Sequence, residues 1–178
     1  MDILTALHSR RSVRSYNSQK VTEEELKTIL AAGMTAPSAG NAQPWHMVVV
    51  DDPALLAQVP SINPYAAMAQ KSPVSVLVCG NTTLEKYPGF WVQDCAAAIQ
   101  NMLLAATSLG IGSVWTGIYP MAERVNKFQE LFKLPAHIIP HALLVFGHVD
   151  DPAAAFAHKN RYDAAKVSRN DTFGQGGL

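Results

Sequence analysis

The chain has 178 residues, of which 48% are hydrophobic, and its 14 basic and 14 acidic residues give a formal net charge of zero. This length suits a single domain over 1–178 with a substantial core. Without a net positive charge, no long-range field favours nucleic acid or an anionic membrane surface, so any bound anion must be held by a local cluster of cations.

The first half of the chain predicts one amphipathic helix and two strands. Thr22 and Glu25 form a capping box ahead of apolar residues at helical spacing, and Pro37 lies just beyond the end of that pattern. Strands are expected over 45–50 and 74–79, and the second of these is an apolar, β-branched run typical of a buried strand.

The second half predicts a long helix over 91–109, a strand over 112–117, a helix over 122–132 and a strand over 138–149. The long helix is apolar over most of its surface, which is typical of helices at the centre of a fold or at an interface. Helices and strands do not alternate regularly, which favours an α+β fold over a doubly wound one. The segment 61–71 has no assigned role.

Two chemical motifs fail on their context. The Gly-Ile-Gly triplet at 110–112 is half of a dinucleotide fingerprint, but here a helix ends into a strand, and the fingerprint needs the reverse order. His137 and His141 have the spacing of zinc ligands on a helix, yet Pro140 between them would break that helix. We therefore expect no metal site.

The cysteines and the N-terminus bear on location. Cys79 and Cys95 lack the spacing of a redox or zinc motif, and we interpret them as buried thiols in a reducing compartment, with a disulfide left open. The first residues do not form a basic flank followed by an apolar signal core. A cytoplasmic protein without a membrane segment is expected.

A basic run near the N-terminus has the composition of a phosphate site. Arg10, Arg11 and Arg14 place three guanidinium groups within five residues, and Ser12 adds a hydroxyl. Arginine pairs bidentately with phosphate oxygens, and a hydroxyl can fill a remaining acceptor position. The alternative from these residues alone is a solvated basic surface.

The loop over 36–46 is a second candidate contact region. Gly40 permits backbone conformations closed to other residues, while Ser38, Asn41 and Gln43 present donors and acceptors. An ordinary helix-to-strand connector anchored by Trp45 is the alternative.

These two segments, in this order, resemble the R-R-S-x-R and P-S-x-x-N-x-Q-P-W motifs of the nitroreductase family. The resemblance continues in Trp-Val-Gln-Asp at 91–94, in Gly-Ile-Gly-Ser-Val-Trp-Thr-Gly at 110–117 and in Lys-Asn-Arg at 159–161. It implies an α+β fold with a mixed central sheet flanked by helices, and a C-terminal tail exchanged across a homodimer.

The resemblance also implies a site for flavin mononucleotide (FMN). Its phosphate and polar ring edge would be surrounded by basic and hydroxyl side chains from both ends of the chain, namely Arg10, Arg11, Ser12, Arg14, Lys159 and Arg161. Loop residues of the partner subunit would contact the flavin, namely Pro37, Ser38, Ala39 and Asn41.

The flavin ring would lie against Trp115, Thr116 and Gly117, with a backbone N–H near Gly117 directed at the ring nitrogen that accepts hydride. Trp115 could equally be a core tryptophan of a buried strand. Thr116 stands where other members of the family carry a glutamate, so no general acid is evident and no residue is assigned a catalytic role.

The activity implied is hydride transfer from NADH or NADPH through FMN to nitroaromatic, quinone or related acceptors by a ping-pong mechanism. Two alternatives stay open. One is a flavin enzyme of the same fold with another redox outcome, such as dehalogenation or heterocycle oxidation, and the other is a flavin-binding protein without catalysis. The expected partners are a second copy of the chain and a small-molecule acceptor.

Overall fold

Four strands form one sheet in the order β1-β2-β4-β3 in the computed structural model, which describes residues 1–169, 173 and 174. They are β1 (Trp45–Val50), β2 (Val74–Asn81), β3 (Ile111–Gly117) and β4 (Ile138–His148). All three neighbouring pairs are antiparallel.

The α+β class is confirmed, but the sheet is not mixed as expected. Within the described residues, parallel pairing is limited to an isolated bridge between Ser12 and Ser113. Antiparallel pairing does not require a helix between successive strands, which explains the irregular order of elements along the chain.

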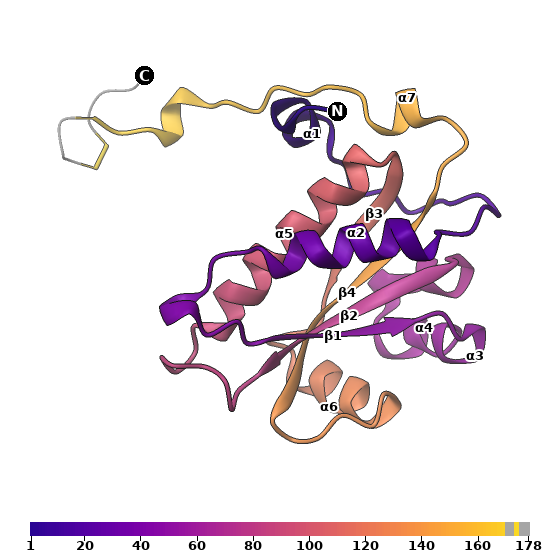
Figure 1. The fold of residues 1–178 in the computed structure, drawn as a ribbon, viewed down its shortest axis with the longest axis vertical. Coiled ribbons are helices and arrows are strands. Elements are labelled where there is room, and N and C mark those ends of the chain that lie inside the picture. The colour runs from indigo at the N-terminus through magenta and orange to yellow at the C-terminus, as the bar shows by residue number, and fades with distance from the viewer. Residues whose placement is uncertain (170–172, 175–178) are drawn as a thin grey trace.

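Helices lie on both faces of this sheet (Figure 1). One face carries α1 (Ile3–Ser9), α2 (Glu23–Met34) and α5 (Trp91–Ser108), and the other carries α3 (Pro53–Leu56), α4 (Val59–Ile62) and α6 (Ala122–Leu131). The short elements are η1 (Ala39–Asn41), η2 (Pro64–Lys71), α7 (Pro152–Ala155) and η3 (Ala164–Lys166). The predicted helices over 91–109 and 122–132 are therefore confirmed to within one residue at each end.

The core is divided by the sheet into two clusters. Alternate residues of a strand point to opposite faces, so Val76 packs under α5 with Ile99, while Leu77 packs with Phe128 of α6 on the other side. Within α5 only Gln93 and Ser108 are exposed, because α1 and α2 cover its outer side, as Figure 1 shows. The long apolar helix therefore lies at the centre of the fold.

The C-terminal segment leaves the body of the protein beside α1. The backbone N–H of Lys159 donates to the carbonyl of His8 at 3.1 Å, and the guanidinium of Arg11 donates to the carbonyl of Ala157. Beyond these contacts the chain runs past α1 and away from the sheet (Figure 1). In the part of the chain that is described, no helix combines the length and apolar character needed to cross a membrane.

Candidate functional site

One edge of the sheet has backbone groups without strand partners. Directly after β3, the N–H of Ile118 donates to the carbonyl of His141 in β4 at 3.1 Å, and this bond shows which residues of β3 face β4. Antiparallel ladders alternate between bonded and non-bonded pairs, so even-numbered residues of β3 bond to β4, and residues 113, 115 and 117 direct their backbone groups to the outer edge. Because β3 is the last strand of the sheet, no strand among the described residues pairs with this edge beyond Ser113.

The N-terminal basic run covers the beginning of that edge. The N–H of Val13 donates to the carbonyl of Ser113 at 2.9 Å, and Ser12 pairs with the same residue. A Cβ on Gly112 would lie 2.8 Å from Val13 Cγ1, so the glycine is what permits this close approach. The buried hydroxyl of Ser113 has no hydrogen-bond partner among the residues that the structure describes.

Three arginines from the two ends of the chain lie close together at this end of β3, namely Arg10, Arg11 and Arg161. Burial, followed by the nearby charges of Arg161 and Arg11, holds the pKa of Arg10 below its usual value. The ion pairs recorded among the described residues, which are Lys127–Glu123, His148–Glu25 and Lys166–Asp163, include no arginine. Like charges that converge without an acidic partner are suited to bind an anion, and a phosphate ester would neutralise them.

The remaining members of the predicted cluster are accessible. Ser12 and Arg14 are exposed, and the guanidinium of Arg14 makes a long contact of 3.5 Å to the carbonyl of Ser12. Lys159 and Arg161 are also exposed, and the tail contact with α1 brings both to the side of the molecule that carries Arg10.

At the far end of β3, alternate residues differ sharply in exposure. Trp115 is 37% exposed, which excludes the interpretation of this residue as a buried core tryptophan in the isolated chain. Thr116 is buried, and its hydroxyl donates to the carbonyl of Leu143 at 2.8 Å. The side chain of Thr116 is thus directed into the protein, away from the open edge to which Gly117 directs its N–H.

The loop that contains Pro37, Ser38, Ala39 and Asn41 is anchored to α5 at a different place. The N–H of Ala39 donates to the buried carboxylate of Asp94 at 2.9 Å, and the hydroxyl of Ser38 accepts the N–H of Gln43. Pro37 and Asn41 are exposed. Among the described residues, no hydrogen bond or ion pair joins this loop to the arginines, so the structure of one chain does not bring the two predicted halves of the site together.

Two functional candidates were not among the predicted site residues, and the first of them, His141, was considered in the sequence only as a zinc ligand. His141 is the extra residue of a bulge where Cys79 pairs with Pro140 and Val78 pairs with Ala142. Its ring lies 5.9 Å from that of Trp91 and 5.8 Å from that of Trp115, centroid to centroid. Burial lowers the pKa of His141 to about 4, so the imidazole is neutral near pH 7.

The second functional candidate is Asn63, which lies in the segment 61–71, to which the sequence analysis assigned no role. Its side chain is fully buried and donates to the carbonyl of Gly117 at 3.2 Å. The only signal in the sequence was a polar residue in an irregular segment. The contact itself could not be predicted, because its two residues are 54 positions apart.

Cys79 and Cys95 are buried free thiols, and burial raises both pKa values to about 12. Neither thiol is therefore a nucleophile near neutral pH. Among the described residues, no three histidine, cysteine or acidic side chains gather in the manner of a metal site.

Comparison with known proteins gives consistent matches over most of the chain. A sequence model of the nitroreductase family matches residues 7–78 and 81–148. A protein of Methanothermobacter thermautotrophicus named "Putative NADH dehydrogenase/NAD(P)H nitroreductase" is 48% identical over 167 residues, which cover 94% of this chain and 86% of that protein.

Solved structures show the same fold. The "Putative NADH Oxidase" of Clostridium acetobutylicum matches with a TM-score of 0.89 at 32% identity, over 94% of this chain and 99% of that one. A "putative nitroreductase in complex with fmn" of Desulfovibrio desulfuricans matches with a TM-score of 0.77 at 30% identity, over 96% and 97% of the two chains.

These matches define the class of the protein as an oxidoreductase. Because the family model covers well over half of the sequence, the chain belongs to the nitroreductase family.

Proposed function

We propose that the protein binds FMN and transfers hydride from NADH or NADPH to nitroaromatic, quinone or related acceptors. Membership of the family supports the reaction class, and the structural relative solved with FMN supports the cofactor. The name of the relative from Methanothermobacter thermautotrophicus supports a reduced nicotinamide nucleotide as the donor.

The main support for the proposal comes from the outer edge of β3. Arginines gather near one end of this edge, and no described strand pairs with it at the other end, over 115–117. The arginine cluster lies at Ser113, and the N–H that Gly117 directs to the outer edge is four residues further along β3. At about 3.3 Å per residue, the two are roughly 13 Å apart. A ligand with an anionic group at one end and a planar acceptor ring at the other fits this edge, whereas a compact anion would use only the arginines.

The residues that would hold the phosphate are the predicted set, Arg10, Arg11, Ser12, Arg14, Lys159 and Arg161. FMN would supply hydride acceptance from the nicotinamide and its return to the acceptor. Gly117 would donate its N–H to the ring, and Trp115 would pack beside it. Thr116 would act only through its place in the strand, because its hydroxyl is already bonded inside the protein.

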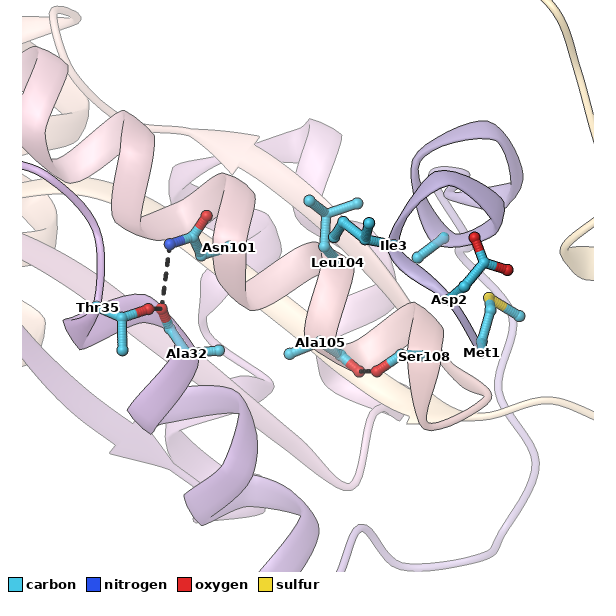
Figure 2. A pocket seen from close by; sticks show the side chains of 10 residues that line it. Met1, Asp2, Ile3, Ala32, Thr35, Asn101, Leu104, Ala105 and Ser108 are labelled. Carbon is cyan, nitrogen blue, oxygen red and sulfur yellow. Dashed lines mark hydrogen bonds between the residues drawn. The ribbon is translucent and has the colours of Figure 1, made fainter.

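We further propose a homodimer in which Pro37, Ser38, Ala39 and Asn41 of one subunit contact the flavin of the other. Support comes from the apolar surface around α1, where Ile3, Leu4 and Leu7 are exposed by 47% or more. A groove of about 390 Å³ lies between α1, α2 and α5, and its walls include Ile3, Leu104 and Ala105 (Figure 2). An obligate interface of more than about 2,000 Å² would cover such a surface.

The C-terminal tail supports the same assembly. Its residues from Asn160 to Lys166 are exposed, and it extends beyond α1 away from the body of its own chain (Figure 1). A tail that packs so little on its own subunit is suited to pack on a second one. A cytoplasmic location is proposed because both thiols are free.

The test is the absorbance spectrum of the purified protein before and after anaerobic addition of NADH. Bound FMN gives a yellow protein that NADH bleaches, and a nitroaromatic or quinone should restore the colour. A colourless protein that takes up no FMN contradicts the proposal. A yellow protein that NADH leaves unchanged indicates flavin binding without this catalysis, and bleaching without turnover of either acceptor indicates another redox outcome.

A further inference from the structure

The carbonyl of Gly117 accepts hydrogen bonds from two side chains on different elements. Asn63 Nδ2 donates from the segment that precedes η2, and Arg124 Nη1 donates from the first turn of α6, each at 3.2 Å. This carbonyl belongs to the strand end that we propose lies beside the flavin ring. Arg124 is therefore fixed next to the reactive end of the site.

A second contact restricts the guanidinium further. Its central carbon lies 5.5 Å from the centroid of the Tyr65 ring, within the range of a cation–π interaction. The backbone N–H of Tyr65 is in turn bonded to Asn63 Oδ1 at 3.2 Å. Asn63 thus positions both groups that hold the arginine, the Gly117 carbonyl and the Tyr65 ring.

The charge of Arg124 is not neutralised by an ion pair within the described part of the chain. The neighbouring carboxylate, Glu123, is bonded instead to Lys127 at 2.7 Å. The hydrogen bond to Lys127 and its charge hold the pKa of Glu123 below the usual value, and the charge of Arg124 adds to this effect. A guanidinium has five N–H donors, and the one bond to Gly117 leaves others for a ligand.

An aromatic ring is exposed beside this cation. Tyr65, the ring over which the guanidinium lies, is 75% exposed. An exposed aromatic surface with one restrained cation suits a flat molecule that carries an anionic oxygen group, because the ring can stack while the guanidinium forms a charge-assisted bond.

We propose that Arg124 binds the carboxylate or phosphate oxygens of the substrate that stacks beside Gly117, and so selects anionic substrates. The inference rests on the proposed function, since it places the anion next to the flavin ring. The same chemistry is offered by two sources, a carboxylated aromatic acceptor and the pyrophosphate of a nicotinamide nucleotide.

The experiment measures dissociation constants for two matched pairs of ligands that do not react. Benzoate and benzamide form the acceptor pair, and NAD⁺ and nicotinamide form the nucleotide pair. Binding is followed by intrinsic tryptophan fluorescence, because Trp115 is partly exposed two residues before Gly117 on β3 and can report a ligand whether or not flavin is present. Arg124→Gln is compared with wild type in both pairs.

We expect the wild-type protein to prefer the anionic member of at least one pair, and Arg124→Gln to reduce that preference by about tenfold or more, which is 1.4 kcal/mol. Arg124→Lys, which keeps the charge but loses the planar fork, should fall between the two. Lys127→Gln is the matched control, because it removes the other cation of the same helix one turn away, and it should leave both preferences unchanged.

A preference in both pairs that stays within twofold of wild type in Arg124→Gln would overturn the inference. An equal loss in Lys127→Gln would overturn it as well, since it would show a general charge effect. Failure of the proposed function is seen separately, as absence of flavin or of bleaching by NADH in the wild-type spectrum. The acceptor pair and the nucleotide pair then tell which source Arg124 recognises.

Discussion

The carboxylate of Asp94 accepts the backbone N–H of Ala39 at 2.9 Å, so the first turn of α5 holds a loop that lies 55 residues earlier in the sequence. That loop contains three residues with left-handed backbone, Gly40, Asn41 and Gln43, whose φ angles are 58°, 54° and 50°. Left-handed conformations are unfavourable for residues other than glycine, and external bonds are needed to maintain them. Asp94 supplies one such bond from a buried position.

Replacing Asp94 by alanine should lower the free energy of unfolding by about 1–3 kcal/mol, because it leaves the Ala39 N–H without its acceptor. Urea denaturation followed by circular dichroism measures the change. Gln93→Ala is the control, since Gln93 is an exposed neighbour on the same helix and should alter stability little. Equal stability of the Asp94 variant and wild type would show that the bond contributes nothing.

Arg14→Ala and Arg161→Ala should each weaken FMN retention by about 1.5–3 kcal/mol, the range for a hydrogen bond to a charged group. Each side chain is exposed and makes no ion pair in the described structure, so the loss should appear in binding and much less in stability. Fluorescence titration of the stripped protein with FMN gives the dissociation constants. Lys20→Ala, an exposed cation outside the predicted set, should bind normally. Wild-type affinity in both arginine variants would refute the phosphate assignment.

Deleting all residues after Asp150 should abolish both dimerisation and flavin binding. The deletion removes Lys159 and Arg161 together with the segment that leaves the body past α1. Sedimentation velocity with detection at a flavin wavelength reports both properties. A deletion of 170–178 alone retains the two cations and should still bind flavin. A flavin-loaded monomer of the longer deletion would be incompatible with a site completed by the tail.

Stability should fall with acid between pH 6.5 and 4 because of His141. The pKa of His141 is about 4 in the folded protein, whereas an unperturbed histidine has a pKa of 6.5. In this interval the unfolded chain therefore takes up a proton at this position and the folded protein does not. At about 1.4 kcal/mol per unit, the loss amounts to roughly 3 kcal/mol and is complete below pH 4. Above pH 6.5 this contribution is fully present.

Urea midpoints measured across that interval test the assignment to His141. His141→Gln should flatten the pH dependence, whereas His137→Gln, at an exposed position, should retain the wild-type slope. If the two variants keep the same slope, another group is responsible.

Initial rates with NADH and one acceptor should give parallel double-reciprocal lines at several fixed acceptor concentrations. The nicotinamide and the acceptor are expected to use the same open side of the Gly117 edge, so the oxidised nucleotide must leave before the acceptor can enter. Lines that intersect would mean that both substrates bind at once, and the shared position would have to be abandoned.

Local sequence signals predicted most of the helices and strands. The capping box of Thr22 and Glu25 forms as expected, with the Thr22 N–H bonded to Glu25 Oε2 at 2.8 Å. The apolar pattern of the long helix and the β-branched run of β2 also predicted buried elements correctly. These features depend on residues that are near one another in the chain, so they can be read from spacing alone.

Long-range contacts were not predictable in the same way. The bulge that turns His141 toward Trp91 arises from a change of register between β2 and β4, and no local pattern specifies it. The bond from Asn63 to Gly117 and the bond from Ala39 to Asp94 likewise join distant segments. Asp94 did offer a signal, a carboxylate within an otherwise apolar helix, but its partner could not be named from the sequence.

The uncovered stretch of the β3 edge is short, which limits how other chains can pair with it. Uncovered edge strands can recruit further chains and lead to aggregation. Here Ser12 and Val13 cover the edge at Ser113, which leaves 115–117 without a covering strand among the described residues. Three residues are fewer than the five or six of an ordinary strand, so another polypeptide gains little by pairing there. The same N-terminal segment that brings the arginines to the sheet thus also shortens the stretch of the β3 edge with which another polypeptide could pair.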